Sequence, residues 1–156
     1  YHSIRIGRVL IEQGQPDHVV FAGYFHDVPE DIESISSLPM EDRKKLLIEF
    51  AEDCDISNPE KAATLTLKCI YLPEEYQAEK DAPSKAEGKK IRKEMACKRW
   101  ANSGTDVHAV KIQDIKDNRN DMKAMSEEWQ TNYDAWAMPL LNHMEKKYNS
   151  SMSRSL

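Results

Sequence analysis

The chain has 156 residues, of which 40% are hydrophobic and 31% are charged, and its formal net charge is −5. This length fits one domain whose hydrophobic core needs neither disulfides nor a structural metal. The acidic balance argues against a broad nucleic-acid-binding surface, because such a surface needs an excess of basic residues. The longest apolar run, about residues 19–25, is far too short to cross a bilayer, so we expect no membrane partner.

The three cysteines, Cys54, Cys69 and Cys97, are widely spaced and form no CxxC pair. They therefore suggest neither a disulfide framework nor a zinc site. With no secretory signal pattern at the start, reduced cysteines and a cytoplasmic location are expected. Because the sequence begins with Tyr1 rather than Met, we also expect the complete protein to have residues upstream of it.

Two helices are expected in the first thirty residues. Apolar residues at helical spacing begin at Ile4, and Gly14 and Pro16 interrupt the pattern. Asp17 can cap the second helix, and Pro29 ends it because proline disfavours helical geometry in the preceding residue. Apolar side chains cover most faces of this second helix, so we expect it to be central and buried.

The rest of the chain also favours helices. Serine, proline and charged residues predict loops over residues 33–40 and 72–84. Helices are expected over about residues 41–52, 59–69, 85–101, 106–125 and 126–148. The second of these begins at an Asn58 cap followed by proline. Without strand alternation, the sequence predicts an all-α domain of roughly six to eight helices over residues 1–148, then a flexible tail over 149–156.

A dense polar cluster follows the second helix. His26 and Asp27 come directly after its apolar run, and Glu30 and Asp31 follow within the next four residues. Charged groups at the end of a buried helix cost free energy unless a counter-charge is present. A metal ion is the natural counter-charge for such a cluster.

Further candidate ligands come from two other helices. His2 precedes the turn at residues 14–16 by about as many residues as His26 follows it, so antiparallel packing places the two histidines at one level. Asp114 lies on a partly buried helix, with Asn118 on the same face. Two histidines and two aspartates suit six-coordinate Mn²⁺, Fe²⁺ or Mg²⁺ better than structural zinc. Such a set leaves positions open for water or phosphate oxygens.

Each of these residues also has a purely structural interpretation. His2 could be an exposed residue at a chain end, and Asp114 with Asn118 could form a solvated helix face. Glu30 and Asp31 could cap the next helix, whose first turn favours acidic residues. The conjunction of all of them in one chain favours a site.

The order of these residues resembles the signature of the HD-domain superfamily of metal-dependent phosphohydrolases. That signature is H…HD…D, present here as His2, His26, Asp27 and Asp114. Residues 26–31, HDVPED, also resemble the HDxxED element of the (p)ppGpp hydrolase branch, which comprises RelA/SpoT homologues and small alarmone hydrolases. Residues 114–118 match the later D-x-x-x-N of that branch. The similarity covers roughly residues 1–125.

The resemblance implies an HD-domain helical bundle and a specific reaction. The two histidines, Asp27 and Asp114 would bind the metal, usually Mn²⁺, while Glu30 and Asp31 would orient and activate the attacking water. Asn118 would contact the nucleotide. The reaction of the branch removes the 3′-pyrophosphate from ppGpp or pppGpp, so the expected partner is a small-molecule nucleotide.

The sequence departs from the family pattern at several positions. Pro29 and Ile32 stand where the family more often has an apolar non-proline residue and a Thr or Ser, and Asp117 stands where His is common. The interval from the HD pair to Asp114 is longer than in typical members. The residues that hold guanine in the family lie upstream of the first histidine, so base specificity does not carry over.

Two other functions stay open beside alarmone hydrolysis. One is another HD-type phosphohydrolase, a nucleotidase or a triphosphohydrolase, and the other is a catalytically silent module that binds a nucleotide or a partner protein. Basic residues over 85–99 could attract phosphates, or could be an exposed helix face. Trp100, Trp129 and Trp136 lie on late helices and could belong to the core or to an interface, which leaves a homo-oligomer open.

Overall fold

A computed structural model describes residues 1–154 and contains only helices in that range. The longer helices are α1 (His2–Glu12), α2 (Asp17–Phe25), α5 (Met40–Asp53), α6 (Pro59–Lys68), α7 (Pro73–Asp81), α8 (Lys85–Ala101), α9 (Thr105–Asp121) and α10 (Glu127–Arg154). Three short turns are α3 (Val28–Asp31), α4 (Glu33–Ser36) and the 3₁₀ turn η1 (Met122–Ala124). The all-α prediction is confirmed. None of the described helices combines the length and the apolar character that crossing a membrane requires.

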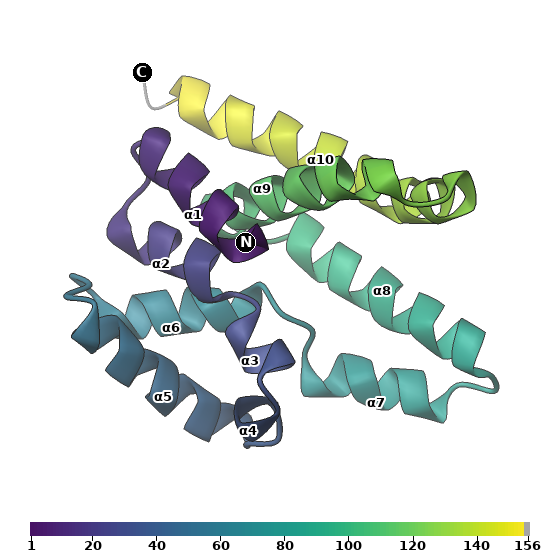
Figure 1. Cartoon of the computed structure of the whole chain (residues 1–156), viewed down its shortest axis with the longest axis horizontal. Helices are drawn as coiled ribbons and strands as arrows, with labels where there is room; N and C mark the ends of the chain where they lie inside the picture. Colours follow the sequence, from purple (N-terminus) through teal and green to yellow (C-terminus); the bar gives the residue numbers. More distant parts are fainter. Residues whose placement is uncertain (155–156) are drawn as a thin grey trace.

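Helix α2 lies at the centre of the bundle, as its apolar sequence predicts. It runs antiparallel to α1 and packs against α6 and α9, while α10 covers α9 (Figure 1). Five of its nine residues are buried. One hydrophobic cluster joins α1, α2, α8, α9 and α10 with part of α6, and a second joins α2, α5 and α6. The antiparallel pair α7–α8 extends to one side of the bundle, and Ala96 and Trp100 of α8 join it to the core.

Two glycines allow α1 and α2 to approach closely. A Cβ atom built on Gly23 would lie 2.4 Å from the Leu10 side chain and 3.6 Å from the Cα atom of Gly7. A Cβ on Gly7 would lie 2.4 Å from the Tyr24 ring. A larger side chain at either position would separate the helices, so the glycines bring the start of α1 next to the end of α2.

Two predicted loops contain helices instead. Residues 33–40 include α4, where Ile35 is buried, and residues 72–84 include α7. Helix α7 forms because the Glu75 carboxylate accepts a hydrogen bond from the Leu72 amide and also pairs with Arg99 of α8. Arg99 is 24 positions away from Glu75 in the sequence, so the local residue pattern does not predict this contact.

Several helix boundaries also differ from the sequence-based expectation. Helix α2 ends at Phe25, and Pro29 lies inside α3. Helix α9 ends at Asp121 and is followed by η1 rather than continuing. Helix α10 continues through Arg154, beyond the predicted end at Tyr148, and the last two residues of the predicted tail lie outside the described range. The Asn58 cap of α6 is confirmed, since its side chain accepts a hydrogen bond from the amide of the third helical residue.

Candidate metal centre

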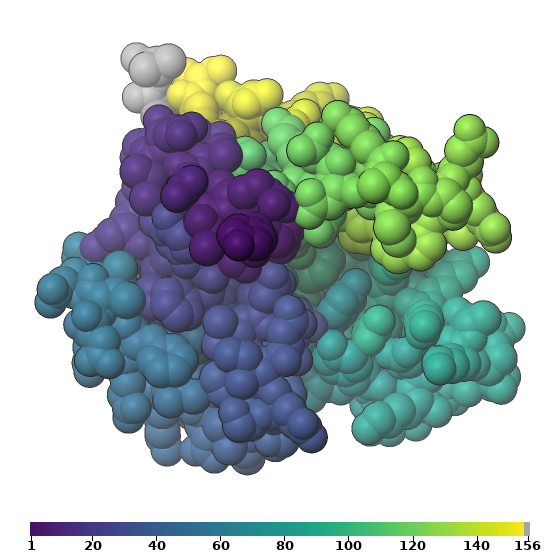
Figure 2. Space-filling model, in the orientation of Figure 1, coloured from purple at the N-terminus to yellow at the C-terminus, as the bar shows by residue number. Residues whose placement is uncertain are grey.

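The close packing of α1 and α2 brings two histidines together. His2 is the first residue of α1, and His26 directly follows α2. Their ring centroids lie 5.6 Å apart, as the antiparallel register predicts. In the space-filling view the start of α1 lies in the middle of one face, bordered by α3 and by the end of α9, so this region reaches the surface (Figure 2).

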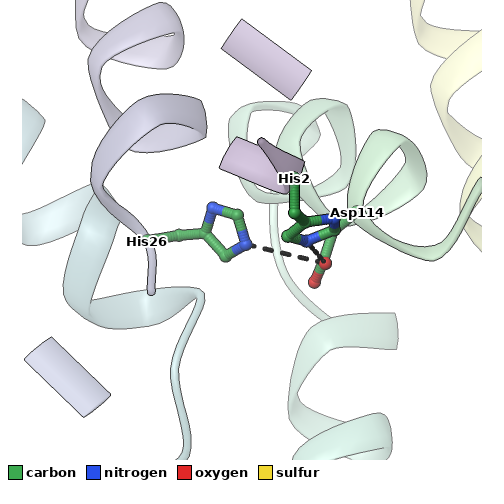
Figure 3. Close-up of side chains that lie close together, drawn as sticks. All are labelled: His2, His26 and Asp114. Carbon is green, nitrogen blue, oxygen red and sulfur yellow. Dashed lines mark hydrogen bonds and ion pairs between the residues drawn. The ribbon is translucent and has the colours of Figure 1, made fainter. Parts of the chain in front are cut away.

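Asp114 of α9 completes a compact set of ligand atoms with the two histidines (Figure 3). Its Oδ1 atom lies 2.9 Å from Nε2 of His2 and 3.6 Å from Nε2 of His26. Asp27 stands beside both rings, with its carboxylate 3.1 Å from Nε2 of His26 and 4.0 Å from Nε2 of His2. The structure therefore brings all four predicted ligands together, from three separate helical elements.

The nitrogen atoms of His26 leave one buried ligand atom available to a cation. The Nδ1 atom contacts the carbonyl oxygen of Gly23 at 2.9 Å, which assigns the Nδ1 proton to that bond. The opposite nitrogen, Nε2, is buried and has no hydrogen-bond partner. It faces the carboxylates of Asp27 and Asp114, which cannot donate when ionised. A divalent cation that accepts nitrogen and oxygen ligands would satisfy all of these lone pairs.

A buried lysine compensates the charge of Asp114. Lys111 lies one helical turn earlier, and its ammonium group is 2.5 Å from Oδ2 of Asp114 and 4.0 Å above the Trp100 ring. Burial by itself raises the pKa of Asp114, but the Lys111 charge and the hydrogen bond from His2 outweigh it and hold that pKa well below its usual range. Asp114 is therefore ionised, with Oδ2 engaged by lysine and Oδ1 facing the histidines.

A second carboxylate orients His2. Its Nδ1 atom lies 2.6 Å from Oδ2 of Asp117, and Arg5 donates two hydrogen bonds of 2.7 Å to the same carboxylate. The hydrogen bond to Asp114 raises the pKa of His2 from 6.5 to about 9. His2, Asp117 and Asp121 also lie close enough to share a cation. Arg5 already pairs with both of those aspartates, so its guanidinium group supplies the positive charge that compensates them.

Glu30 and Asp31 lie on α3, next to the candidate ligands. The Glu30 carboxylate accepts a hydrogen bond of 2.9 Å from the Tyr76 hydroxyl on α7, and burial raises the pKa of Glu30. Partial burial, and then the nearby charge of Asp27, raise the pKa of Asp31. Within residues 1–154, neither carboxylate forms a hydrogen bond with a candidate ligand. Their roles in water activation stay predictions.

Asn118 lies where its spacing from Asp114 predicts. Its amide nitrogen is 3.1 Å from Oδ1 of Asp114, the same oxygen that faces the histidines. The predicted contact between Asn118 and a nucleotide is untested, but the residue does border the candidate site.

Sequence reasoning missed three residues of this site. Lys111 and Asp117 lie three residues before and after Asp114, so helical periodicity could have placed both beside it. Tyr76 had no such indicator, because its helix was expected to be a loop.

No family model, curated protein or solved structure matches the chain. The resemblance to HD-domain hydrolases therefore depends on the sequence motifs at residues 2, 26–31 and 114–118.

Proposed function

We propose that the chain is a metal-dependent phosphohydrolase of the HD type that hydrolyses a nucleotide phosphoester. The reaction we favour is removal of the 3′-pyrophosphate from (p)ppGpp, with Mn²⁺ as the cation and Fe²⁺ or Mg²⁺ as alternatives. One observation carries the proposal: Nε2 of His26 is buried without a partner and faces the carboxylates of Asp27 and Asp114, with His2 alongside. That donor set suits a catalytic divalent cation.

In this proposal the protein side chains divide the work. A divalent cation held by the four ligands would lower the pKa of water and neutralise phosphate charge. Glu30 accepts the proton of the attacking water at its carboxylate, because burial raises its pKa towards the working range of a general base. Tyr76 holds that carboxylate in position. Asp31 orients the water, and Asn118 binds the nucleotide beside Asp114.

Product release from ppGpp with Mn²⁺ tests the proposal, with GTP, dGTP and AMP assayed in parallel. We expect pyrophosphate from ppGpp, and loss of both metal binding and turnover in Asp27→Ala. Retained turnover in that variant would refute the metal assignment. Turnover of the ordinary nucleotides alone would favour a general HD-type nucleotide phosphohydrolase, and metal binding without any turnover would favour a silent binding module.

Glu30→Gln tests the proton acceptor separately from the metal. We expect unchanged Mn²⁺ affinity and a turnover reduced by about 10²–10⁴-fold, because the amide cannot accept the proton. Glu33→Gln is the matched control, since Glu33 is exposed on the adjacent helix α4. Near-normal turnover in Glu30→Gln would remove Glu30 from this role.

The cellular location and the oligomeric state are also part of the proposal. Cys54, Cys69 and Cys97 are all free, which favours the reducing cytoplasm. Trp100 is buried in the core, whereas Trp129 is 52% exposed and is the candidate for a contact between subunits.

A further inference from the structure

We propose that a cleft between α8 and α10 binds a phosphate group of the nucleotide, separate from the group hydrolysed at the metal centre. This inference rests on the proposed function. The two helices diverge from the middle of the molecule (Figure 1), and the space between them has a volume of about 860 Å³. Lysines of α8 and Trp136 of α10 line opposite walls.

The cleft has an excess of positive charge in a chain whose net charge is −5. Of its three lysines, Lys90 pairs with Glu94 at 3.8 Å. Lys89 and Lys93 have no carboxylate within 4 Å in the described part of the chain. Lys93 is half-buried, and its ammonium group lies 4.6 Å above the Trp136 ring. An aromatic face attracts this cation without neutralising it, so the charge remains available to an anion.

The unpaired polar groups of the cleft are hydrogen-bond donors. The indole nitrogen of Trp136 is buried and has no acceptor. The ammonium groups of Lys89 and Lys93 are also donors, with no acceptor capacity. A phosphate group has only acceptor oxygens when fully ionised, and hydrogen bonds from charged donors to it are strong. The two ammonium groups therefore complement a phosphate directly, and the indole N–H joins them only when the Trp136 ring turns its buried nitrogen towards the cleft.

Both walls of the cleft contain side chains that neighbour residues of the metal centre. On α10, Trp136 packs edge-on against Tyr133 with ring centroids 4.7 Å apart, and the Tyr133 hydroxyl lies next to Asn118. Asn118 in turn contacts Asp114. On α8, Cys97 lines the cleft; burial raises the pKa of its thiol to about 11, and the charge of Lys111 opposes this effect. Tyr133 and Asn118 therefore stand between Trp136 in the cleft and Asp114 at the metal centre, and the proposal places one phosphate of the ligand on each side of them.

Binding measured without catalysis tests this cleft. The probe is ppGpp, titrated calorimetrically into the full chain in the presence of a chelator, so that no hydrolysis occurs. We expect Lys93→Glu and Lys89→Glu to weaken binding by about tenfold or more, because each reverses a charge beside the phosphate. Trp136→Phe keeps the aromatic ring and removes the N–H donor, and we expect a loss of about threefold to tenfold. Lys98→Glu is the control, an exposed lysine of α8 outside the cleft.

Each outcome bears on the cleft separately from the hydrolysis. Binding that weakens in the three cleft variants but not in Lys98→Glu supports the inference, even if the wild type hydrolyses no ppGpp. Binding that is absent in the wild type, or equal in all variants, overturns the inference even if ppGpp is hydrolysed. In a hydrolysing enzyme, the inference also requires Lys89→Glu to raise KM more than it lowers kcat.

Discussion

Helices α6 and α9 both bury one face in the core, but the side chains that they bury differ in kind: those of α6 are mostly apolar, and several of those of α9 are ionisable. The buried residues of α6 are apolar apart from Thr66, whose hydroxyl donates to the Ala62 carbonyl within the same helix. Helix α9 buries eight residues, three of which are ionisable: His108, Lys111 and Asp114. Helix α6 needs no partner to satisfy its polar groups, whereas α9 depends on groups supplied by α1, α2 and α8.

This difference makes α9 the helix on which the proposed metal centre depends. Apolar residues of similar size at Lys111 and Asp114 would avoid the free-energy cost of desolvating two charges. The pair compensates that cost internally, but it leaves Oδ1 of Asp114 facing the unpartnered nitrogen of His26. A buried nitrogen that faces carboxylates and has no hydrogen-bond partner is typical of a binding site. Among the described residues of α6, no buried side-chain nitrogen or oxygen lacks a hydrogen-bond partner.

The largest effect should follow from breaking the ion pair of α9. In a chelator, we expect Lys111→Met to lower the free energy of unfolding by about 3–5 kcal/mol, because Asp114 loses its buried counter-charge. Saturating Mn²⁺ should restore part of this loss, since a cation held by Asp114 compensates the same charge. Denaturant titrations with and without Mn²⁺ measure both values.

Leu47→Ala is the matched variant on the apolar side of the molecule. Leu47 is fully buried in the cluster that α5 forms with α2 and α6. We expect a loss of about 2–5 kcal/mol from the cavity. Mn²⁺ should raise the stability of this variant by as much as it raises that of the wild type. If Mn²⁺ rescued Lys111→Met no better than Leu47→Ala, the link between α9 and the metal would be wrong.

A smaller effect is expected when the second carboxylate around His2 is changed. Asp117→Asn preserves shape but weakens the acceptor for the Nδ1 proton of His2. We expect Mn²⁺ affinity to fall about 10-fold to 100-fold, because such hydrogen bonds orient a ligating histidine and raise its basicity. Asp121→Asn, which changes only an exposed partner of Arg5, is the control. Calorimetric titration with Mn²⁺ should separate the two variants, and equal affinities would contradict an orienting role.

A pH dependence of stability is also expected in the chelated protein. The pKa of His2 is raised to about 9 by its hydrogen bond to Asp114, so the native state binds this proton more tightly than the unfolded state does. The resulting stabilisation is fully present below pH 6.5 and is lost as the pH rises through about 9. Denaturant titrations across this window should therefore show a steeper decline for the wild type than for His2→Gln. Parallel curves for the two proteins would refute the assignment.

Much of the fold could be predicted because helical periodicity is local. The apolar run of α2 and the Asn58 cap of α6 both depend on neighbouring residues, and both are confirmed. Helix α7 was missed because its stabilising partner, Arg99, comes from another helix. Helix α4 was missed because its four residues depend on docking the buried side chain of Ile35 rather than on intrinsic preference.

The sequence by itself determined the all-helical class and the set of candidate ligands. Regular spacing specifies helices, and acidic and histidine side chains at the end of a buried helix indicate a need for counter-charge. Only the tertiary structure decided how those ligands are oriented. Asp117 contacts His2 across 115 positions of the chain and Arg5 across 112. Tyr76 donates to Glu30 across 46 positions. These contacts depend on how α1, α3, α7 and α9 pack, and no local pattern encodes that packing.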